Sequence, residues 1–390
     1  MAAPTPAPQA EKIPTVLTKF GDKRVDNYYW LRERENPKVV KYLEAENALV
    51  EAELGHTNDF QKKLFEEMKM RIKEDDQSVP VKIDNYYYYR RVETGKEYTI
   101  YCRKKDSLEN PEEIILDVNE KAKGHDYYSA IVNVSDDHKM LAYAADTEGR
   151  RIFTIRFIDL ESKKEASDYI AGVTGNFEWA SDSRTIFYTE KDANTLRPHK
   201  LFRYKLGTPT PEFVKEEKDD TYVLGITKST SLQYMFVYSY STLSTEYSYI
   251  ETDRPKMEPK LIQKRTKKLE YTVEDGGDRF YILTNYKAKN FRVMEVKKEK
   301  LDLKNWKEVI PHRTTHYLES LDVFENHLVL QEKSKGHTVF EVLNRNNKKK
   351  HLVTFKDPTY EASPDENPNY ETDKFRYVYE SLNTPDSTYD

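Results

Sequence analysis

Cysteine is almost absent from this chain of 390 residues. The single cysteine, Cys102, excludes an intrachain disulfide and a metal cluster held by several thiolates. We expect Cys102 to pack as a small apolar residue within a strand.

Glycine and long apolar runs are also scarce. None of the 12 glycines occurs in G-x-S-x-G, the turn that carries a hydrolase serine, or in a G-x-x-x-x-G-K-[ST] or G-x-G-x-x-G phosphate loop. No segment approaches the roughly 18 apolar residues of a membrane span. The first residues lack the basic region and apolar core of a signal peptide. We therefore expect no membrane partner.

The charges point to a well-solvated surface. Charged residues make up 34% of the chain and the net charge is −5. The basic run 348–350 is interpreted as a solvated hairpin tip, so no nucleic acid partner is expected. His312 and His316 follow a proline in a predicted loop, which favours a surface role over metal binding. The acidic runs 74–76 and 219–220 are interpreted as solvated loops. No cofactor and no metal are expected.

What the chain does contain is a repeated β-hairpin. In residues 179–207 a polar turn with an aspartate precedes a β-branched and aromatic run, a charged loop and a second run that alternates polar and apolar residues. Alternation at period two predicts a hairpin. Six further units show this pattern: 85–90 with 98–102, 140–144 with 152–157, 234–238 with 247–250, 280–284 with 291–296, 327–331 with 338–342, and 375–379.

The spacing of the hairpins predicts the fold. Their first strands recur every roughly 46 to 54 residues, the period of four-stranded propeller blades. The sequence therefore predicts a mainly β, seven-bladed propeller over residues 78–390. We expect the last blade to be incomplete, because the partner strand of 375–379 is predicted to begin only where the chain reaches Asp390.

The residues before the propeller differ in character. Residues 1–13 are rich in Pro and Ala and are predicted to be disordered. Residues 14–77 are predicted to form a helical arm, with one helix that begins at Asn36-Pro37 and ends at Gly55 and a second capped by Asn58-Asp59. Because propeller blades bury one another, the apolar stripes of this arm require a further domain as their cover.

Several motifs resemble the prolyl oligopeptidase family of serine peptidases, and its oligopeptidase B group in particular. They lie at 27–37, 42–47, 149–157, 178–185, 196–198, 281–285 and 288–292. The resemblance implies a helical arm and a propeller joined to a C-terminal α/β-hydrolase domain on which the arm packs. It also implies cleavage of short peptides after Lys or Arg, with the propeller limiting access by size.

No catalytic residue is carried over from the family onto this sequence. The resemblance places the Ser, Asp and His of such enzymes in the hydrolase domain, so the chain is expected to be inactive alone. Arg150 and Arg151 match a family motif and are predicted to contact the other domain, with a solvated turn as the alternative. Adjacent arginines can bind carboxylates bidentately.

Two readings of the function follow. The first is the arm and propeller of an oligopeptidase B-like peptidase, whose partners are a hydrolase domain in the same or a second chain and short basic peptides. The second is a stand-alone propeller that binds proteins or peptides. A cytoplasmic location is expected; the alternative is a periplasmic one, since an Ala/Pro-rich start also remains after removal of a signal peptide.

Overall fold

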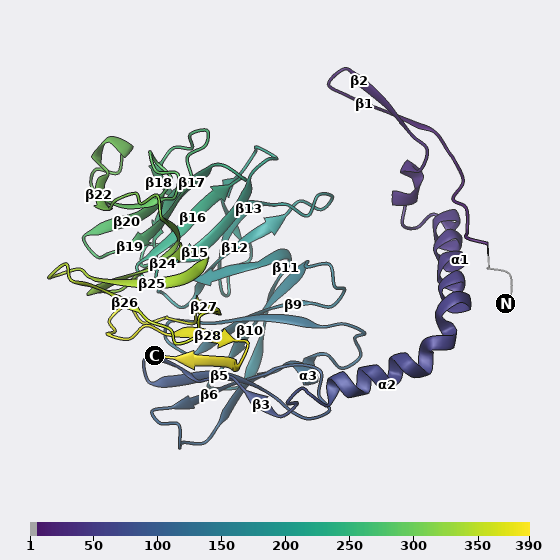
Figure 1. Cartoon of the computed structure of the whole chain (residues 1–390), viewed down its shortest axis with the longest axis horizontal. Helices are drawn as coiled ribbons and strands as arrows, with labels where there is room; N and C mark the ends of the chain where they lie inside the picture. The colour runs from purple at the N-terminus through teal and green to yellow at the C-terminus, as the bar shows by residue number, and fades with distance from the viewer. Residues whose placement is uncertain (1–5) are drawn as a thin grey trace. The chain divides into compact units, whose positions relative to one another are not determined.

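The computed structural model describes residues 6–390, which form two compact units divided between Glu74 and Asp75 (Figure 1). The predicted disordered start, 1–13, lies partly outside the described residues. The first unit contains β1 (Thr15–Lys19), β2 (Asp22–Asp26), η1 (Tyr29–Arg32), α1 (Pro37–Leu54), η2 (Gly55–Thr57) and α2 (Asn58–Lys69). Within the described part of the chain, no helix is both long and apolar enough to cross a membrane.

Helix α1 begins and ends where the sequence predicts. The Asn36 side chain caps it by accepting a hydrogen bond from the Lys38 backbone N–H at 3.0 Å, and Gly55 follows its last residue. The predicted Asn58-Asp59 cap of α2 is wrong. The chain is already helical at the N-cap residue, Thr57, so no extended residue is present to cap the helix. Asn58 instead donates from Nδ2 to Glu51 Oε1, at 3.3 Å.

The β1–β2 hairpin was not predicted from the sequence. Its two turn residues, Phe20 and Gly21, have φ angles of 54° and 85°, and Lys19 pairs with Asp22 across the turn. Positive φ at both central residues matches the twist of a tight hairpin. The two strands carry mostly polar side chains, so their apolar alternation is weak.

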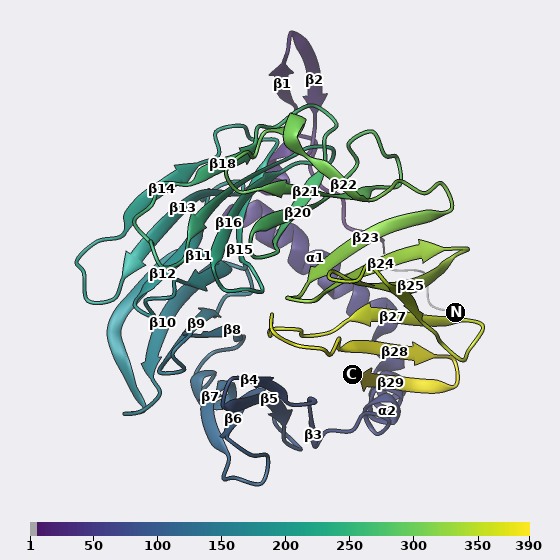
Figure 2. The ribbon, with the colours of Figure 1, turned by 90° about the vertical axis from the view of Figure 1, so that its left-hand side faces the viewer.

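The second unit is a β-propeller of seven blades (Figure 2). Blade 1 contains β3 (Asp76–Gln77), β4 (Val81–Ile83), β5 (Tyr86–Val92), β6 (Ile100–Lys105) and β7 (Glu113–Asp117), followed by α3 (Val118–Lys121). Blade 2 contains β8 (Ser129–Val134), β9 (Met140–Asp146), β10 (Phe153–Asp159) and the first part of β11 (Lys164–Trp179). Blade 3 contains the second part of β11, β12 (Thr185–Lys191), β13 (Pro198–Lys205) and β14 (Glu212–Glu216).

The remaining blades follow the same antiparallel order. Blade 4 contains β15 (Val223–Lys228), β16 (Tyr234–Tyr240), β17 (Thr245–Glu251) and β18 (Lys260–Gln263). Blade 5 contains β19 (Tyr271–Asp275), β20 (Arg279–Thr284), β21 (Arg292–Lys297) and β22 (Lys307–Ile310), with η3 (Leu303–Asn305) before β22. Blade 6 contains β23 (His316–Val323), β24 (His327–Ser334), β25 (His337–Asn344) and β26 (Lys350–Val353), and blade 7 contains β27 (Tyr360–Pro364), β28 (Tyr377–Ser381) and β29 (Thr384–Tyr389).

Strand β11 serves two blades at once. Its first part pairs with β10 and its second part with β12, so blades 2 and 3 form one continuous sheet. The pairing shifts register between Val173 and Phe177, around Gly175. A register shift of this kind bends and twists a strand. The bend turns β11 from the outer edge of blade 2 to the inner edge of blade 3.

Blade 7 is more complete than the sequence suggested. The expectation that the partner strand of 375–379 begins only at Asp390 is wrong, because β29 pairs with β28 and places Tyr389 opposite Tyr377. The residues of β29 are mostly polar, with a proline among them. Hydrophobic alternation, the signal used for the other strands, is therefore absent.

The core of the propeller lies between the faces of neighbouring blades. Phe280 of blade 5 is fully buried, and its ring lies 5.2 Å from that of Tyr234 and 5.6 Å from that of Phe236, both in blade 4. Edge-to-face rings at these distances add to the gain from burial. The first strands of successive blades contact one another, for example β8 with β11 and β19 with β23. They therefore form the inner wall of the propeller.

Replacing Phe280 with Ala is expected to destabilise the propeller by about 3–5 kcal/mol, because it removes a buried ring and leaves a cavity between two blades. Urea unfolding followed by circular dichroism measures this loss. The control, Leu382→Ala, removes a side chain that is 99% exposed. It is expected to change stability by no more than about 0.5 kcal/mol. Equal losses of stability in the two variants would contradict the conclusion that the core of the propeller lies between its blades.

Candidate functional site

The two predicted arginines lie at the tip of the β9–β10 hairpin. The turn is organised by Asp146, the last residue of β9, which is 1% exposed. Its carboxylate accepts backbone hydrogen bonds from Glu148 at 2.9 Å, Gly149 at 3.0 Å and Arg151 at 2.6 Å. Three N–H donors on one carboxylate hold the turn in a single shape. The positive φ of Gly149, 72°, fits this turn without strain.

The tip carries two arginine side chains that lack an ion-pair partner among the described residues. Arg150 and Arg151 are both exposed, and within residues 6–390 neither side chain forms an ion pair. Lys191, from the neighbouring β12, donates from Nζ to the Arg151 carbonyl oxygen. Partial burial and then the Arg151 charge lower the pKa of Lys191. Two free guanidinium groups on a rigid turn can each bind a carboxylate through two parallel hydrogen bonds.

Two other motifs behind the family resemblance hold the links between blades. Arg197, which directly precedes β13, donates from Nη1 to the Tyr222 carbonyl oxygen at 2.8 Å, in the segment that leads into blade 4. Asn290 donates from Nδ2 to the carbonyl oxygens of Arg313 and Thr314, both at 3.1 Å, in the segment before blade 6. These residues satisfy backbone groups in loops and position successive blades. Their role is structural.

The inner strands carry carboxylates that the sequence analysis missed. Glu178, Glu274 and Asp322 lie on β11, β19 and β23, the first strands of blades 3, 5 and 6. Burial and then the charges of Asp322 and Asp275 raise the pKa of Glu274 to about 8. Burial raises the pKa of Asp322 to about 6. Each of the three residues is the last but one of its strand, a repeat that the sequence also contains.

Glu178 is the best-partnered of these carboxylates. Its Oε2 accepts a hydrogen bond from Asn133 Nδ2 at 2.9 Å, across from blade 2. Burial raises its pKa, while the hydrogen bond from Asn133 and the nearby charge of Lys228 act in the opposite direction. Lys228 itself is bound to Asp136 at 2.5 Å. The inner wall is therefore acidic, and its buried lysine already has a carboxylate partner.

The other candidates from the sequence are not brought together into a site. Within residues 6–390 there is no group of three or more His, Cys, Asp or Glu side chains arranged to hold a metal ion. His316 begins β23, and its Nδ1 lies 2.9 Å from Thr315 Oγ1. Cys102 is fully buried beside Tyr89 and Ile100, as expected for a small apolar residue. Burial raises the pKa of its thiol to about 12, so it is a poor nucleophile.

The pKa of Glu274 predicts how stability changes with pH. Between its ordinary value of 4.5 and about 8, the folded chain keeps a proton that the unfolded chain has lost. The stability of the propeller is therefore expected to fall as pH rises through this window. Glu274→Gln is expected to flatten this dependence and to be more stable than the unaltered chain at pH 8, in urea unfolding from pH 5 to 8. The exposed Glu161→Gln is the control, and a flat profile for the unaltered chain would contradict the prediction.

The role of Asp146 can be tested separately from that of the arginines. Asp146→Ala is expected to leave three N–H groups without their acceptor and to destabilise the blade by about 1–3 kcal/mol. Amide hydrogen exchange of residues 147–152 is then expected to become faster, while that of β16 stays unchanged. Asp182→Ala, at a turn on blade 3, is the matched control, because its carboxylate accepts from Thr185 N at 2.7 Å. It is expected to speed exchange at 183–185 and not at 147–152.

Comparisons with known proteins cover the whole chain. The family model of the prolyl oligopeptidase N-terminal β-propeller domain matches residues 8–390. The chain is 33% identical to dipeptidyl aminopeptidase BI of Pseudoxanthomonas mexicana, over 100% of this chain and 56% of that protein. It is also 33% identical to Protease 2 of Moraxella lacunata, over 98% of this chain and 56% of that protein.

Solved structures give the same result. The structure of oligopeptidase B from Leishmania major superposes with a TM-score of 0.92 at 25% identity, over 99% of this chain and 58% of that one. Oligopeptidase B from Trypanosoma brucei has the same fold, with a TM-score of 0.91 at 24% identity over 98% of this chain. The chain thus spans little more than half the length of the relatives that it matches. It belongs to the prolyl oligopeptidase family and comprises the propeller part of such a protein.

Proposed function

We propose that this chain is the arm and propeller of an oligopeptidase B-like serine endopeptidase that cleaves short peptides after Lys or Arg. The observation that carries the proposal is the match along almost the whole chain, with a TM-score of 0.92, to oligopeptidase B. The matched relatives extend well beyond this part, since the chain spans 56% of their length. We place the catalytic serine, aspartate and histidine in that further part. The propeller then limits the size of the peptides that reach them.

The acidic inner wall supports a positively charged substrate. Glu178, Glu274 and Asp322 project from neighbouring or nearby inner strands, and Glu274 forms no hydrogen bond or ion pair within residues 6–390. Asp322, whose pKa is raised only to about 6, is ionised at neutral pH and gives the wall a negative potential that attracts cationic peptides and repels anionic ones, whereas Glu274 keeps its proton up to about pH 8. This property agrees with cleavage after Lys or Arg.

The apolar surface of the arm supports a further domain as its partner. Leu43, Val50, Phe60, Phe65 and Met68 are each more than half exposed. Exposed apolar patches of this kind mark surfaces that another protein surface covers. We assign this cover to a C-terminal α/β-hydrolase domain, present in the same chain or supplied by a second one.

A second candidate is a propeller that binds proteins or peptides without cleaving them. The free guanidinium groups of Arg150 and Arg151 favour it, because they are suited to hold carboxylates of a partner. Binding without a nucleophile accelerates no hydrolysis. One measurement therefore distinguishes the two functions: whether peptides are cleaved when a hydrolase domain is present.

A chimera tests the first proposal. The matching part of Protease 2 from Moraxella lacunata is replaced by residues 1–390, and hydrolysis of short fluorogenic peptides with Arg, Lys, Ala or Glu before the cleaved bond is compared. We expect cleavage after Arg and Lys and little cleavage after Ala or Glu. A folded protein substrate is expected to stay intact. A soluble chimera that hydrolyses none of these peptides, or that cleaves the folded protein as readily as the short peptides, would contradict the proposal.

The same chimera tests Arg150 and Arg151. If they bind carboxylates of the hydrolase domain, changing both to Ala is expected to lower kcat/KM about tenfold or more, through the loss of charge-assisted hydrogen bonds. High salt is expected to lower the kcat/KM of the unaltered chimera as well. The matched control changes Lys348 and Lys349, exposed residues at the tip between β25 and β26, to Ala. Equal kcat/KM values in the two double variants would contradict the contact with the hydrolase domain and would support the alternative, that Arg150 and Arg151 lie on a solvated turn.

A further inference from the structure

One connection in this propeller differs from the others in length. In blades 1 to 6 the inner strand and the second strand are joined by turns of two to five residues. In blade 7 the same connection, between β27 and β28, contains the 12 residues 365–376. Loops of about this length without a helix or strand of their own are uncommon in compact domains, and many of them are functional. We call residues 365–376 the strap.

The base of the strap continues the hairpin of blade 7. The Asp365 N–H donates to the Arg376 carbonyl oxygen at 3.1 Å. The Asn367 side chain bridges the two arms, because its Nδ2 donates to the carbonyl oxygens of Asp365, at 2.8 Å, and Arg376, at 2.9 Å. Beyond Asn367 the strap extends past the ends of β27 and β28 toward the middle of the ring (Figure 2). It therefore leaves blade 7 as a hydrogen-bonded hairpin.

The tip of the strap contacts the blades on both sides of blade 7. Asn369 donates from Nδ2 to the Lys82 carbonyl oxygen of blade 1, at 2.7 Å. The next residue, Tyr370, accepts at its hydroxyl a hydrogen bond from Arg345 Nη1 of blade 6, at 3.1 Å. The Tyr370 carbonyl oxygen accepts from the Glu325 N–H of blade 6 at 3.0 Å. The Tyr370 ring packs against the apolar cluster that blades 5 and 6 share.

Arg345 extends these contacts to blade 5. Its Nη2 donates to the Gly276 carbonyl oxygen at 2.5 Å, and its Nε donates to the Tyr281 hydroxyl at 3.3 Å. The Tyr370 hydroxyl also lies 3.6 Å from the position that a Cβ atom on Gly277 would take. Two consecutive residues of one loop thus reach blade 1 in one direction and blades 5 and 6 in the other. The strap therefore crosses the end of the ring at which the inner strands finish.

The strap lies over the end of the ring that holds two of the acidic groups of the inner wall. Tyr370 and Arg345 are bonded to the turns that directly follow β23 and β19. Asp322 and Glu274 are the last but one residues of these strands. Burial raises the pKa of both carboxyls, to about 6 for Asp322 and about 8 for Glu274. A cover at this end of the ring agrees with that burial.

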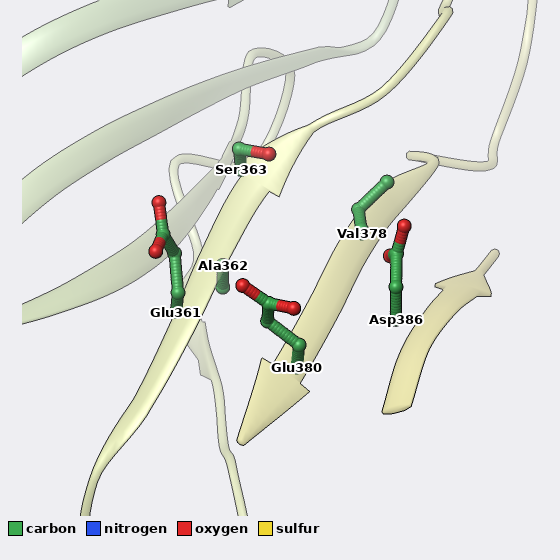
Figure 3. Close-up of a pocket in the computed structure, with 6 residues that line it drawn as sticks. All are labelled: Glu361, Ala362, Ser363, Val378, Glu380 and Asp386. Atoms are coloured by element: carbon green, nitrogen blue, oxygen red, sulfur yellow. The ribbon is translucent and has the colours of Figure 1, made fainter. Parts of the chain in front are cut away.

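The strap is not supported by packing on every side of its own blade. Glu361 and Ser363 of β27, with Val378, Glu380 and Asp386 of the neighbouring strands, line a hollow of about 130 Å³ (Figure 3). Ser363 and Val378 are a ladder pair next to the base of the strap. A hollow bordered mainly by carboxylates offers little apolar contact. The position of the strap therefore depends on the contacts of its tip.

We propose that the strap closes one end of the central channel of the propeller, and that Asn369 and Tyr370 hold it in place. The blades of a propeller surround a central channel. The strap crosses this channel where β4, β19 and β23 finish, and it is bonded to blades 1 and 6. The interior of the ring is then a chamber that solutes enter from the opposite end. The carboxyls of Glu274 and Asp322 lie near its closed end.

A cysteine placed near the strap tests the closure. Asp322→Cys is introduced into the 390-residue chain, which is treated with iodoacetamide under native conditions, and the labelled positions are located by peptide mass. In this background, Asn369→Ala combined with Tyr370→Ala is expected to speed labelling at position 322 about tenfold or more, as the loss of two hydrogen bonds implies. Tyr370→Phe keeps the ring and loses one hydrogen bond, so a smaller acceleration is expected.

Three controls separate the opening of this end from unfolding. Glu371→Ala removes an exposed side chain of the strap and is expected to leave labelling unchanged. Ser129→Cys, at the first residue of β8, places the probe at the other end of an inner strand, where the strap variants are expected to have no effect. Cys102 is fully buried and is expected to stay unlabelled as long as the blades are folded.

Two results would overturn the proposal. One is equal labelling at position 322 in the double variant and in Glu371→Ala, because the strap would then cover nothing. The other is an equal acceleration at positions 322 and 129 and at Cys102, because it would show a loss of the fold and no closure specific to one end.

Discussion

The packing of blade on blade is the constraint on which this structure depends. Each small sheet has apolar side chains on its faces, and a four-stranded sheet cannot bury both of them alone. Neighbouring blades supply the cover, as Phe280 of blade 5 does between the rings of Tyr234 and Tyr249. Blades 2 to 6 each share apolar clusters with two neighbours, and this packing builds the ring. The last junction in that ring has the least apolar surface to offer, and side chains such as Arg376 take over there.

Because the core lies between the faces of the blades, the loops and the inner edges of the sheets do not contribute to it. The hairpin of Arg150 and Arg151 lies at a rim, where a turn needs only local hydrogen bonds to keep its shape. The inner strands converge so closely that their polar side chains are partly buried, which is why the pKa of Glu274 is raised. Exposed arginines at a rim and partly buried acidic groups on the inner wall thus arise from one geometry. The two roles that we propose, peptide recognition and contact with a further domain, would then use different surfaces of the same ring.

The sequence predicted those parts of the fold whose signal is local and apolar. The central hairpins of the blades were found because period-two alternation marks a half-buried strand, and α1 was found because Asn36, Pro37 and Gly55 mark its ends. Strands β1, β2 and β29 were missed because their side chains are mostly polar. The α2 cap was misplaced because the chain stays helical through Thr57, which composition does not reveal.

The candidate site was predictable only in part, for a related reason. Arg150 and Arg151 stand out as neighbours in the sequence, whereas Glu178, Glu274 and Asp322 are brought to one wall by the ring. Likewise, Arg376 and Pro80 are separated by nearly the whole propeller in the chain, and only closure of the ring makes them neighbours. Contacts of this kind depend on the arrangement of all seven blades. They leave no pattern at the level of a short segment.

Asp146 has a consequence for how such a protein can diverge. It holds the backbone of the hairpin through main-chain N–H groups and makes no use of the side chains at positions 150 and 151. The residues at the tip can therefore be exchanged in the course of evolution, or by design, while the scaffold beneath them persists. Separate positions encode the shape of the turn and the chemistry that it presents, so new partners can be acquired without refolding the blade.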